Sequence, residues 1–438
     1  MKLAHPRAIL RTLPLLAATA MLWSAPAQAV APVQYRVLHT FCENISTCAD
    51  GFEPGGDQLV LDAGGDLFGT TSNGGRYEAG ALYELSPKHG GAKYFKHVLT
   101  AFCWPERCGT GSHPASGVIM DTAGNLYGTT PANGDSTCGV VYEAIVSSGK
   151  AQMKALHNFA STGGDGCAPS FTALDYQGKE TGQLYDGISP LYGLTGQGGA
   201  NGHGALYELT PPKPGRKAWQ ETILVSFCGL EFCTDSDSPR GNLVMDGAGD
   251  FFTTTSNGRI LRIVPDSGGY VSTLAYRSHT NENYTTLRVK ADGTLVGVAA
   301  GGGTTSNGTL FTLTPDPVNG YQYTLLHDFC ATDCLDGQIP VSVTVDSSGN
   351  IFGVTEGGGA GTAPPGAPFA GGGVIFRYTT GGSYSVLHSF CMETDCTDGG
   401  LPSSGLTLDG NGNLFGTTDF GGVPFSAGAG VAYELSQF

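Results

Sequence analysis

The sequence has no long amphipathic helical pattern and few charged residues, and each lack narrows the folds that it can adopt. Charged residues make up 14% of the 438 residues. No segment combines the 3.6-residue apolar period with the length of a helix, which excludes helical bundles and helical solenoids. The one apolar stretch near the amino terminus is too short to cross a membrane comfortably, and no other run of apolar residues reaches the length that a span needs. An all-β fold remains.

Basic residues are also scarce. The chain has 22 Lys and Arg residues against 38 Asp and Glu residues, so its formal net charge is -16. An acidic surface repels phosphate backbones and anionic lipid heads, which argues against nucleic acid and membrane surfaces as partners. Basic proteins, cations and neutral glycans remain as partners, and acidity that serves solubility alone is the simpler explanation.

The amino terminus has the three parts of a secretory signal peptide. Lys2, Arg7 and Arg11 come first, an apolar stretch runs from Leu13 to Trp23, and Ala27-Gln28-Ala29 supplies small residues for cleavage before Val30. We therefore expect a signal peptide over residues 1–29 and a single domain over residues 30–438, secreted or periplasmic and monomeric. Cleavage removes three of the 22 basic and none of the 38 acidic residues, which moves the charge from -16 to -19.

Seven copies of one phrase, about 58 residues apart, run along the chain. Each has an apolar run, Asp, two residues and Gly, then Leu-Phe-Gly-Thr-Thr or a variant, a Gly-rich stretch and a closing Gly-x-Leu-Tyr-Glu-Leu. The copies are Leu59–Leu85, Val118–Ala144, Leu174–Leu209, Leu243–Ile263, Leu287–Leu313, Val343–Tyr378 and Leu406–Leu435. The motif Asp residues are Asp62, Asp121, Asp175, Asp246, Asp346 and Asp409, with Lys290 in the fifth copy.

Each copy predicts four short strands. Three lie within the phrase, and the fourth is an aromatic-ended segment between copies, such as Tyr35 to Phe41. Asp and Gly between the first two strands are typical of a tight turn. Four antiparallel strands repeated radially form a propeller blade, so we predict a seven-bladed β-propeller. The segment Tyr35 to Phe41 precedes the first copy and the last copy has no such follower, so we expect this strand to complete the seventh blade.

Twelve cysteines in an exported chain predict disulfides. Ten lie in close pairs that recur with the repeat, after a strand that ends in Phe. These pairs are Cys42 with Cys48, Cys103 with Cys108, Cys228 with Cys233, Cys330 with Cys334 and Cys391 with Cys396. Cys138 and Cys167 remain and have only each other to pair with. Zinc is disfavoured, because its sites use closer Cys-x-x-Cys spacing.

The repeat resembles the GloVer tandem repeat of exported bacterial proteins that carry a choice of carboxy-terminal anchors. The segments Gly124 to Thr130 and Gly412 to Thr418 carry the resemblance best. The fifth copy departs from it, since Leu295 to Ala299 replaces the Leu-Tyr-Gly-Thr-Thr segment, and the sequence ends at Phe438 without an anchor. The resemblance implies an extracellular repeat protein, and it supplies no catalytic residue.

Candidate functional residues must therefore be sought at positions that the repeat does not share. In a four-stranded blade the Cys-bearing loops and the Gly-rich loops emerge on one face, here called the loop-rich face, and the Asp-turns emerge on the other. Loops that vary on a rigid scaffold are where binding usually resides. We therefore expect the ligand on the loop-rich face, at the residues His113, Asp135, His203, Arg240, Glu356 and Asp419. The long loop from Gly357 to Gly373 would act as a lid or contact arm over this face.

Acidic residues also recur after the second cysteine of the pairs, at Asp50, Asp235, Asp336 and Asp398. Carboxylate oxygens are ligands for calcium. Asp followed by Gly is ordinary turn chemistry, which we favour over a metal site. No other cofactor is expected.

Two functional classes remain open, and the sequence does not decide whether the protein is an enzyme. The first is a binding or interaction module for a glycan or a protein at the cell exterior. The second is a carbohydrate-active enzyme, a polysaccharide lyase or glycoside hydrolase, with its site on the loop-rich face. Convergence of Glu356 and Asp419 in one pocket would supply a carboxylate pair of the kind that glycosidases use.

Overall fold

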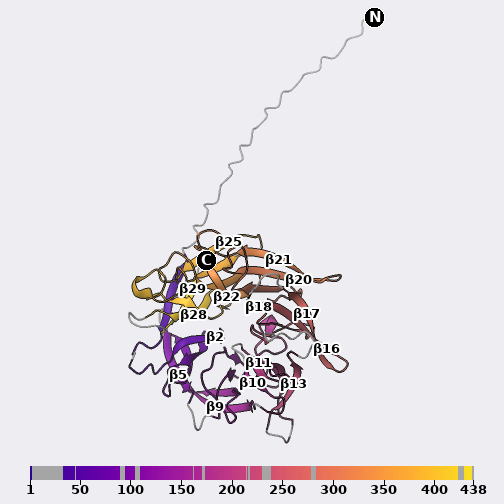
Figure 1. Cartoon of the computed structure of the whole chain (residues 1–438). Coiled ribbons are helices and arrows are strands. Elements are labelled where there is room, and N and C mark those ends of the chain that lie inside the picture. The colour runs from indigo at the N-terminus through magenta and orange to yellow at the C-terminus, as the bar shows by residue number, and fades with distance from the viewer. Residues whose placement is uncertain are drawn as a thin grey trace.

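The structure, a computed structural model, is a ring of seven antiparallel β-sheets (Figure 1). It describes residues 1, 33–44, 46–88, 94–103, 109–160, 162–169, 173–213, 215, 218–228, 238–277, 283–422 and 429–436. The predicted signal peptide lies outside these residues except for Met1. None of the described helices has the length and hydropathy that a membrane span needs.

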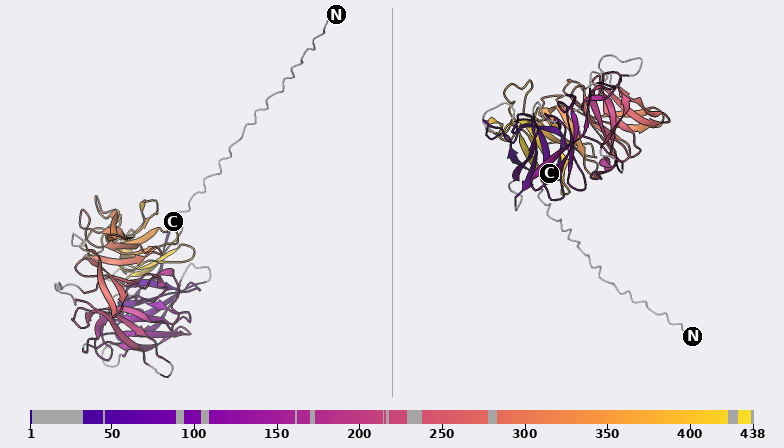
Figure 2. Two further views of the ribbon diagram at one scale, coloured as in Figure 1. Left: turned by 90° about the vertical axis from the view of Figure 1, so that its right-hand side faces the viewer. Right: turned by 90° about the horizontal axis from the view of Figure 1, so that it is seen from below.

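Each sheet is one propeller blade, and the repeat phrase supplies its first three strands. Figure 2 shows the sheets from two further directions, with loops projecting beyond them on both sides. Blade 1 consists of β2 (Phe52–Leu61), β3 (Leu67–Asn73), β4 (Ala81–Pro87) and β5 (Tyr94–Ala101). Blade 2 consists of β6 (Ile119–Met120), β7 (Leu126–Thr130), β8 (Val140–Ser147) and β9 (Lys150–Asn158). Blade 3 consists of β10 (Gly166–Pro169), β11 (Leu191–Gly198), β12 (Ala205–Thr210) and β13 (Gln220–Ser226).

Blades 4 to 6 follow the same order. Blade 4 consists of β14 (Val244–Met245), β15 (Phe251–Thr254), β16 (Arg259–Asp266) and β17 (Gly269–Arg277). Blade 5 consists of β18 (Tyr284–Val289), β19 (Leu295–Ala299), β20 (Thr309–Asp316) and β21 (Gly320–Asp328). Blade 6 consists of β22 (Gln338–Val345), β23 (Ile351–Gly357), β24 (Val374–Tyr378) and β25 (Tyr384–Ser389). Two short 3-10 helices are also described, η1 (Lys179–Thr181) and η2 (Thr394–Cys396).

Blade 7 joins the two ends of the chain, as predicted. Its inner strand is split into β26 (Gly400–Pro402) and β27 (Thr407–Leu408), followed by β28 (Leu414–Phe420) and β29 (Val431–Ser436). The outer position is filled by β1 (Gln34–Thr40), which pairs antiparallel with β29 from Gln34 opposite Ser436 to Thr40 opposite Val431. In Figure 1 β29 accordingly lies beside the indigo start of the chain.

The Gly of the second strand has a steric cause. Gly69 of β3 pairs with Tyr83 of β4, and a Cβ on Gly69 would lie 2.4 Å from the Tyr83 hydroxyl. Gly128 and Tyr142 of blade 2 repeat this arrangement, with a corresponding distance of 2.5 Å. The tyrosine ring therefore packs over the bare backbone of the neighbouring strand, which only glycine allows.

The motif Asp holds the turn between the first two strands, as predicted. The Asp121 carboxylate accepts hydrogen bonds from the backbone N–H groups of Ala123 and Asn125, both at 2.8 Å. In the fifth copy, where Lys290 replaces the Asp, Asp292 instead accepts the N–H of Thr294 at 2.9 Å. These turns form the second face of the ring, here called the turn face.

The hydrophobic core lies between neighbouring blades. Phe68 of blade 1 shares a cluster of buried side chains with Leu126 and Tyr142 of blade 2, and Phe352 of blade 6 shares one with Leu414 and Tyr433 of blade 7. A single blade cannot bury both of its faces, so blade stability depends on its neighbours.

Candidate functional site

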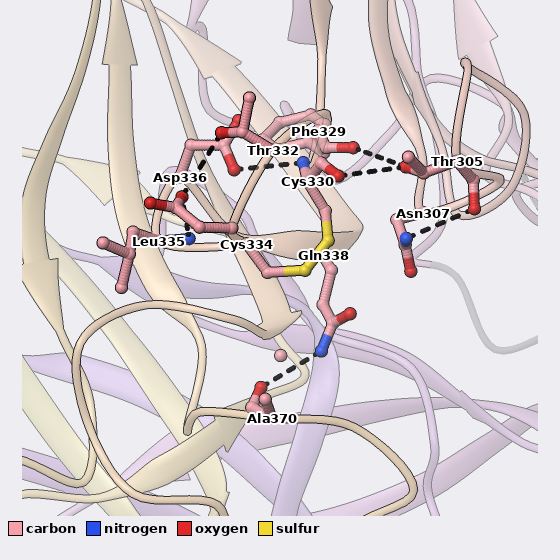
Figure 3. The surroundings of a disulfide bond; sticks show 12 residues. Thr305, Asn307, Phe329, Cys330, Thr332, Cys334, Leu335, Asp336, Gln338 and Ala370 are labelled. Atoms are coloured by element: carbon pink, nitrogen blue, oxygen red, sulfur yellow. Dashed lines mark hydrogen bonds between the residues drawn. A yellow bond between two sulfur atoms is a disulfide. The ribbon is translucent and has the colours of Figure 1, made fainter.

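The Cys-bearing loops and the Gly-rich loops lie on one face and are bonded to each other. The disulfide between Cys138 and Cys167 joins the Gly-rich loop of blade 2 to the first strand of blade 3. In blade 6, Gly359 donates its N–H to the carbonyl of Cys334 at 2.9 Å. Figure 3 shows the same association around Cys330 and Cys334, where Gln338 donates to the carbonyl of Ala370 in the long sixth loop.

Four of the six predicted disulfides are described. They are Cys42–Cys48, Cys138–Cys167, Cys330–Cys334 and Cys391–Cys396. Cys103 and Cys228 are disulfide-bonded as well. The residues predicted as their partners, Cys108 and Cys233, lie outside the described residues. Disulfides persist in oxidising compartments, so this framework agrees with a location outside the cytoplasm.

The acidic residues after the second cysteines anchor their own loops. Asp336 accepts a hydrogen bond from the N–H of Cys330 at 3.0 Å (Figure 3). It also lies 2.8 Å from Nε2 of His327. Asp398 accepts the N–H of Met392 at 2.9 Å. Such contacts fit the turn interpretation of these carboxylates. Asp235 lies outside the described residues, and calcium binding stays a prediction.

Asp50 is the most strongly paired member of this set. Its carboxylate lies 3.0 Å from Nε2 of His39 and 2.8 Å from the ammonium of Lys96. Burial alone raises the pKa of Asp50, but the hydrogen bonds from His39 and Lys96 outweigh burial and hold this pKa below its usual value.

Two predicted carboxylates, Glu356 and Asp419, come within electrostatic reach of each other from two neighbouring blades. Burial raises the pKa of Asp419 to about 7, and the charges of Glu53 and Glu356 add to this rise. Burial also raises the pKa of Glu356. Within the described part of the chain neither carboxylate forms an ion pair. Asp419 instead accepts a hydrogen bond from the hydroxyl of Ser403 at 2.5 Å.

The repeat itself positions this pair. In blade 7 the buried hydroxyl of Thr418 accepts the N–H of Val431 at 3.1 Å, and Thr355 of blade 6 does the same for Val374. These bonds fix the ends of β28 and β23. Glu356 and Asp419 are the next residues along each strand, one residue before β23 and β28 end on the loop-rich face.

Glu53 and His113 extend the site into blades 1 and 2. They occupy the same place in the repeat, directly before Pro54 and Pro114, with φ of 54° and 52°. His113 Nδ1 lies 3.0 Å from the carbonyl oxygen of Ser72, and Ser72 occupies in blade 1 the position that Asp419 occupies in blade 7. Glu356, Asp419, Glu53 and His113 therefore form an arc over four consecutive blades, here called the carboxylate arc.

The other predicted residues lie apart from the arc. Asp135 and Arg240 are exposed, and His203 is half-buried in the Gly-rich loop of blade 3. The backbone N–H of Asp135 donates a hydrogen bond to the side-chain oxygen of Asn158 at 3.1 Å. No described contact joins these three residues to Glu356 or Asp419. They stay predictions of ligand contacts.

The long sixth loop folds back onto the sheet. Gly358 donates its N–H to the carbonyl of Ala370 at 2.7 Å, which closes the base of the loop. Thr362 donates to the carbonyl of Cys391 at 3.0 Å, so the loop also touches the Cys-bearing loop at the end of its own blade. The loop is thus packed beside Glu356 on the loop-rich face.

A cavity of about 790 Å³ opens at the other end of the ring, on the turn face. It is lined by the inner strands of blades 1, 4, 5, 6 and 7 and by η1. Two ion pairs lie in its lining: Arg288 is 3.1 Å from Asp57, and Lys179 is 4.0 Å from Asp175. Although burial raises the pKa of Asp57, Arg288 and Lys179 hold it below its usual value.

The cavity and the carboxylate arc are therefore different places. None of the six predicted ligand-contact residues lines the cavity. Two ion pairs join charges of the cavity, whereas Glu356 and Asp419 have no ion-pair partner among the residues that the structure describes. The arc therefore carries the stronger chemical signal. Asp57 and Arg288 could not be recognised from local sequence patterns, because they pair across the ring only when the ring is closed. Glu53 was detectable, since it shares the place of His113 before a proline.

Among solved structures the chain is similar to virginiamycin B lyase from Staphylococcus aureus, at 12% identity over 92% of this chain and 99% of that chain, with a TM-score of 0.53. A streptogramin B lyase is similar at 13% identity over 94% and 99% of the two chains, also with a TM-score of 0.53. The extracellular domain of a one-component system from B. thetaiotaomicron is similar at 13% identity, covering 92% of this chain and 40% of that chain, with a TM-score of 0.50. Likeness at these identities shows the fold alone.

No curated protein matches the sequence significantly. The model of the Gloeobacter/Verrucomicrobia repeat matches residues 167–364 and 257–437, which together cover more than half of the chain. This match agrees with the repeat phrase, the propeller fold and the recurrent Gly and Tyr pairs described above. The chain belongs to the Gloeobacter/Verrucomicrobia repeat family.

Proposed function

We propose that the protein is an exported binding module that recognises a neutral, polyhydroxylated ligand, a glycan, at the carboxylate arc. The observation that supports this most is the pair Glu356 and Asp419, which lie in electrostatic reach of each other on the loop-rich face without a basic partner among the described residues. Carboxylates that are not neutralised by the protein are strong hydrogen-bond acceptors for ligand hydroxyl groups.

Charge supports the same class of ligand. The chain has a formal net charge of -16, and three of its acidic groups lie together in the arc. Anionic polysaccharides and phosphates would be repelled there, whereas a neutral sugar would not. His113 at the end of the arc offers a ring nitrogen as an additional polar group beside the carboxylates.

A carbohydrate-active enzyme is the second candidate, because one specific observation favours it. Asp419 has a pKa of about 7, so a substantial fraction of this carboxyl group holds its proton at neutral pH. A protonated carboxyl group beside a second carboxylate is the arrangement of a general acid and its partner in glycoside hydrolysis. In this case Asp419 would act as the acid and Glu356 as the base or nucleophile.

One set of proteins tests both candidates. The wild type, Asp419→Asn and Glu356→Gln are screened on a panel of neutral and anionic polysaccharides, with affinity, reducing ends and unsaturated products measured on the same samples. Binding without new products supports the module. Products that disappear in Asp419→Asn support the enzyme.

The matched control is Asp266→Asn, because Asp266 is an exposed carboxylate in the hairpin that joins β16 to β17, remote from the arc. This variant should bind like the wild type. If no neutral polysaccharide binds, or if both arc variants bind as well as the control, the proposed site is wrong.

Export and oligomeric state belong to the same proposal. We expect the mature protein to start at Val30 and to be a monomer outside the cytoplasm. Amino-terminal sequencing of protein recovered from the periplasm or medium, followed by light scattering, measures both. A retained Met1 in the recovered protein would contradict export by this signal peptide.

A further inference from the structure

Several junctions between blades share one contact, and the junction between blades 2 and 3 places a carboxylate in it. In these junctions a residue of the outer strand of one blade faces the outer strand of the preceding blade or the loop that follows it. Between blades 5 and 6, Tyr384 stacks on His327 with ring centroids 3.8 Å apart and donates its hydroxyl to the carbonyl of Asp336 at 2.5 Å. The phenol thus completes a cluster of His, Asp and Tyr.

The junctions beside blade 7 fill the same position with a phenol or a cation. Tyr35 stacks on His388 at 3.8 Å and donates to the carbonyl of Asp398 at 2.5 Å. Between blades 7 and 1 the position is held by Lys96, whose ammonium lies 2.8 Å from Asp50. Each of these groups can donate a hydrogen bond to the loop that carries the Asp.

Between blades 2 and 3 the position is held by Glu221, which has no proton to donate when it is ionised. Glu221 of β13 lies 3.8 Å from Nε2 of His157, and Asp165 lies 3.5 Å from the same nitrogen. His157, Asp165 and Glu221 place one ligand atom each within 4.8 Å of one another. The described residues contain no other group of three such side chains with this geometry.

Two atoms of this cluster are left without a partner. Nε2 of His157 and Oε1 of Glu221 are buried and have no hydrogen bond in the structure. Two carboxylates and an imidazole nitrogen thus lie close together, and no positively charged side chain among the described residues lies between them. Buried polar atoms without a hydrogen bond are rare in proteins and need an explanation.

We propose that His157, Asp165 and Glu221 form a binding site for a divalent transition metal, with Zn²⁺ as the best fit. Zinc is held by imidazole nitrogen and carboxylate oxygen at about 2.0–2.2 Å, so ligand atoms in a tetrahedral site lie about 3.4 Å apart. The separations of 3.5 and 3.8 Å from the histidine nitrogen need only small side-chain movements to meet this value. A water molecule or a ligand group would take the fourth position.

A bound cation accounts for a carboxylate at a position where blades 1, 6 and 7 carry Lys96, Tyr384 and Tyr35. A cation held between Asp165 and Glu221 would tie the outer strand of blade 3 to the loop that follows blade 2, as Lys96 ties blade 1 to Asp50. The side chains are 13% to 19% exposed, so an ion can enter from solvent. The role of the metal is to clamp two blades, which is independent of the carboxylate arc.

The test measures zinc binding by the whole protein. After dialysis against a chelator, isothermal titration with ZnCl₂ should show one site of micromolar or tighter affinity, and the melting temperature should rise with zinc concentration. The variant Glu221→Tyr introduces the residue that blades 5, 6 and 7 carry at this position as Tyr323, Tyr384 and Tyr35. It should therefore fold and lose at least about 100-fold in affinity. His327→Gln alters the equivalent histidine of the junction between blades 5 and 6 and should bind zinc like the wild type.

Glu221→Gln provides a second variant that keeps the size of the side chain and should also bind zinc more weakly. Wild-type protein that binds no zinc at millimolar concentration would overturn the proposal. Equal binding by the wild type, Glu221→Tyr and Glu221→Gln would place the zinc elsewhere and would overturn it too. Loss of zinc binding in His327→Gln but not in the Glu221 variants would also overturn the proposal.

Discussion

At the residue scale, the Asp419 carboxyl group makes stability depend on pH. Its pKa is about 7 in the folded protein and about 3.9 in an unfolded chain. Between these values the folded state holds a proton that the unfolded state has released. This contribution is therefore fully present below about pH 4 and is lost as pH rises through 7, with a magnitude of up to about 4 kcal/mol.

The substitution Asp419→Asn removes this titration while it keeps an oxygen that accepts the Ser403 hydroxyl. We expect the melting temperature of the wild type to fall from pH 5 to pH 8 by more than that of the variant. Asp266→Asn is the matched control and should follow the wild type. Parallel curves for the wild type and Asp419→Asn would show that Asp419 is ionised throughout this range.

The recurring Gly of the second strand gives a second prediction at this scale. Gly69→Ala places a Cβ at 2.4 Å from the Tyr83 hydroxyl and 2.8 Å from Leu59, so the ring must move. Overpacking of a core usually costs about 1–3 kcal/mol, and we expect a loss of about 2 kcal/mol in urea unfolding. Gly247→Ala meets no atom within 4 Å and should be neutral. A neutral Gly69→Ala would mean that the third-strand tyrosine is free to shift.

At the scale of the element, blade 3 contains an insertion, residues 179–190 between the motif Asp175 and β11, that lies on the turn face. Tyr185 is fully buried, and its backbone N–H donates to the carbonyl of Met120 at 3.0 Å in the inner strand of blade 2. Its ring packs edge-on against Tyr127 with centroids 5.2 Å apart. The insertion therefore joins blades 2 and 3 from outside the repeat.

Tyr185→Ala removes this buried ring and should destabilise the protein by about 3–5 kcal/mol, the usual cost of removing a large aromatic side chain from a core. Leu184→Ala changes the neighbouring side chain, which is 46% exposed, and should cost little. Urea unfolding of both variants measures the difference. Similar midpoints would show that the insertion is not part of the folded core.

The elements were more predictable than the sites, and the reason is physical. Strand positions follow from local patterns, so the repeat phrase predicted the strands, the Asp-turns and the loop-rich face. Glu356 and Asp419 could be paired because both follow the same Thr in equivalent strands. Glu221 could not be recognised, because its partners His157 and Asp165 belong to the preceding blade. Inter-blade contacts depend on how the ring packs, which no local pattern records.

At the scale of the whole molecule, the two faces are expected to have different roles. His113→Ala and His203→Ala together should weaken ligand binding with little change in stability, because both lie in or beside loops of the loop-rich face. Asp121→Asn and Asp409→Asn should lower stability and leave binding by the folded fraction intact, since each carboxylate holds a turn. Melting curves and binding assays on the same samples measure this. The reverse pattern would place the ligand on the turn face, where the cavity lies.

Closure of the ring is a property of the whole molecule and depends on the first strand of the chain. Strand β1 supplies the outer edge of blade 7, and the backbone N–H of Phe41 donates to the carbonyl of Gly430 at 3.1 Å. Arg36 of β1 forms an ion pair with Glu434 of β29. Tyr35 reaches further and stacks on His388 of blade 6. One short strand at the start of the chain therefore holds both the last blade and its neighbour.

Deletion of residues 30 to 41 should unfold the protein or make it oligomerise, because blade 7 would present an unpaired edge in β29. Size-exclusion chromatography with light scattering and thermal melting measure the two outcomes. Deletion of residues 30 to 33 alone is the control, since β1 starts at Gln34, and it should leave both properties unchanged. A monomer that lacks residues 30 to 41 and melts like the wild type would show that the ring does not need this strand, whereas rescue by an added peptide of residues 33 to 41 would tie the defect to the open edge.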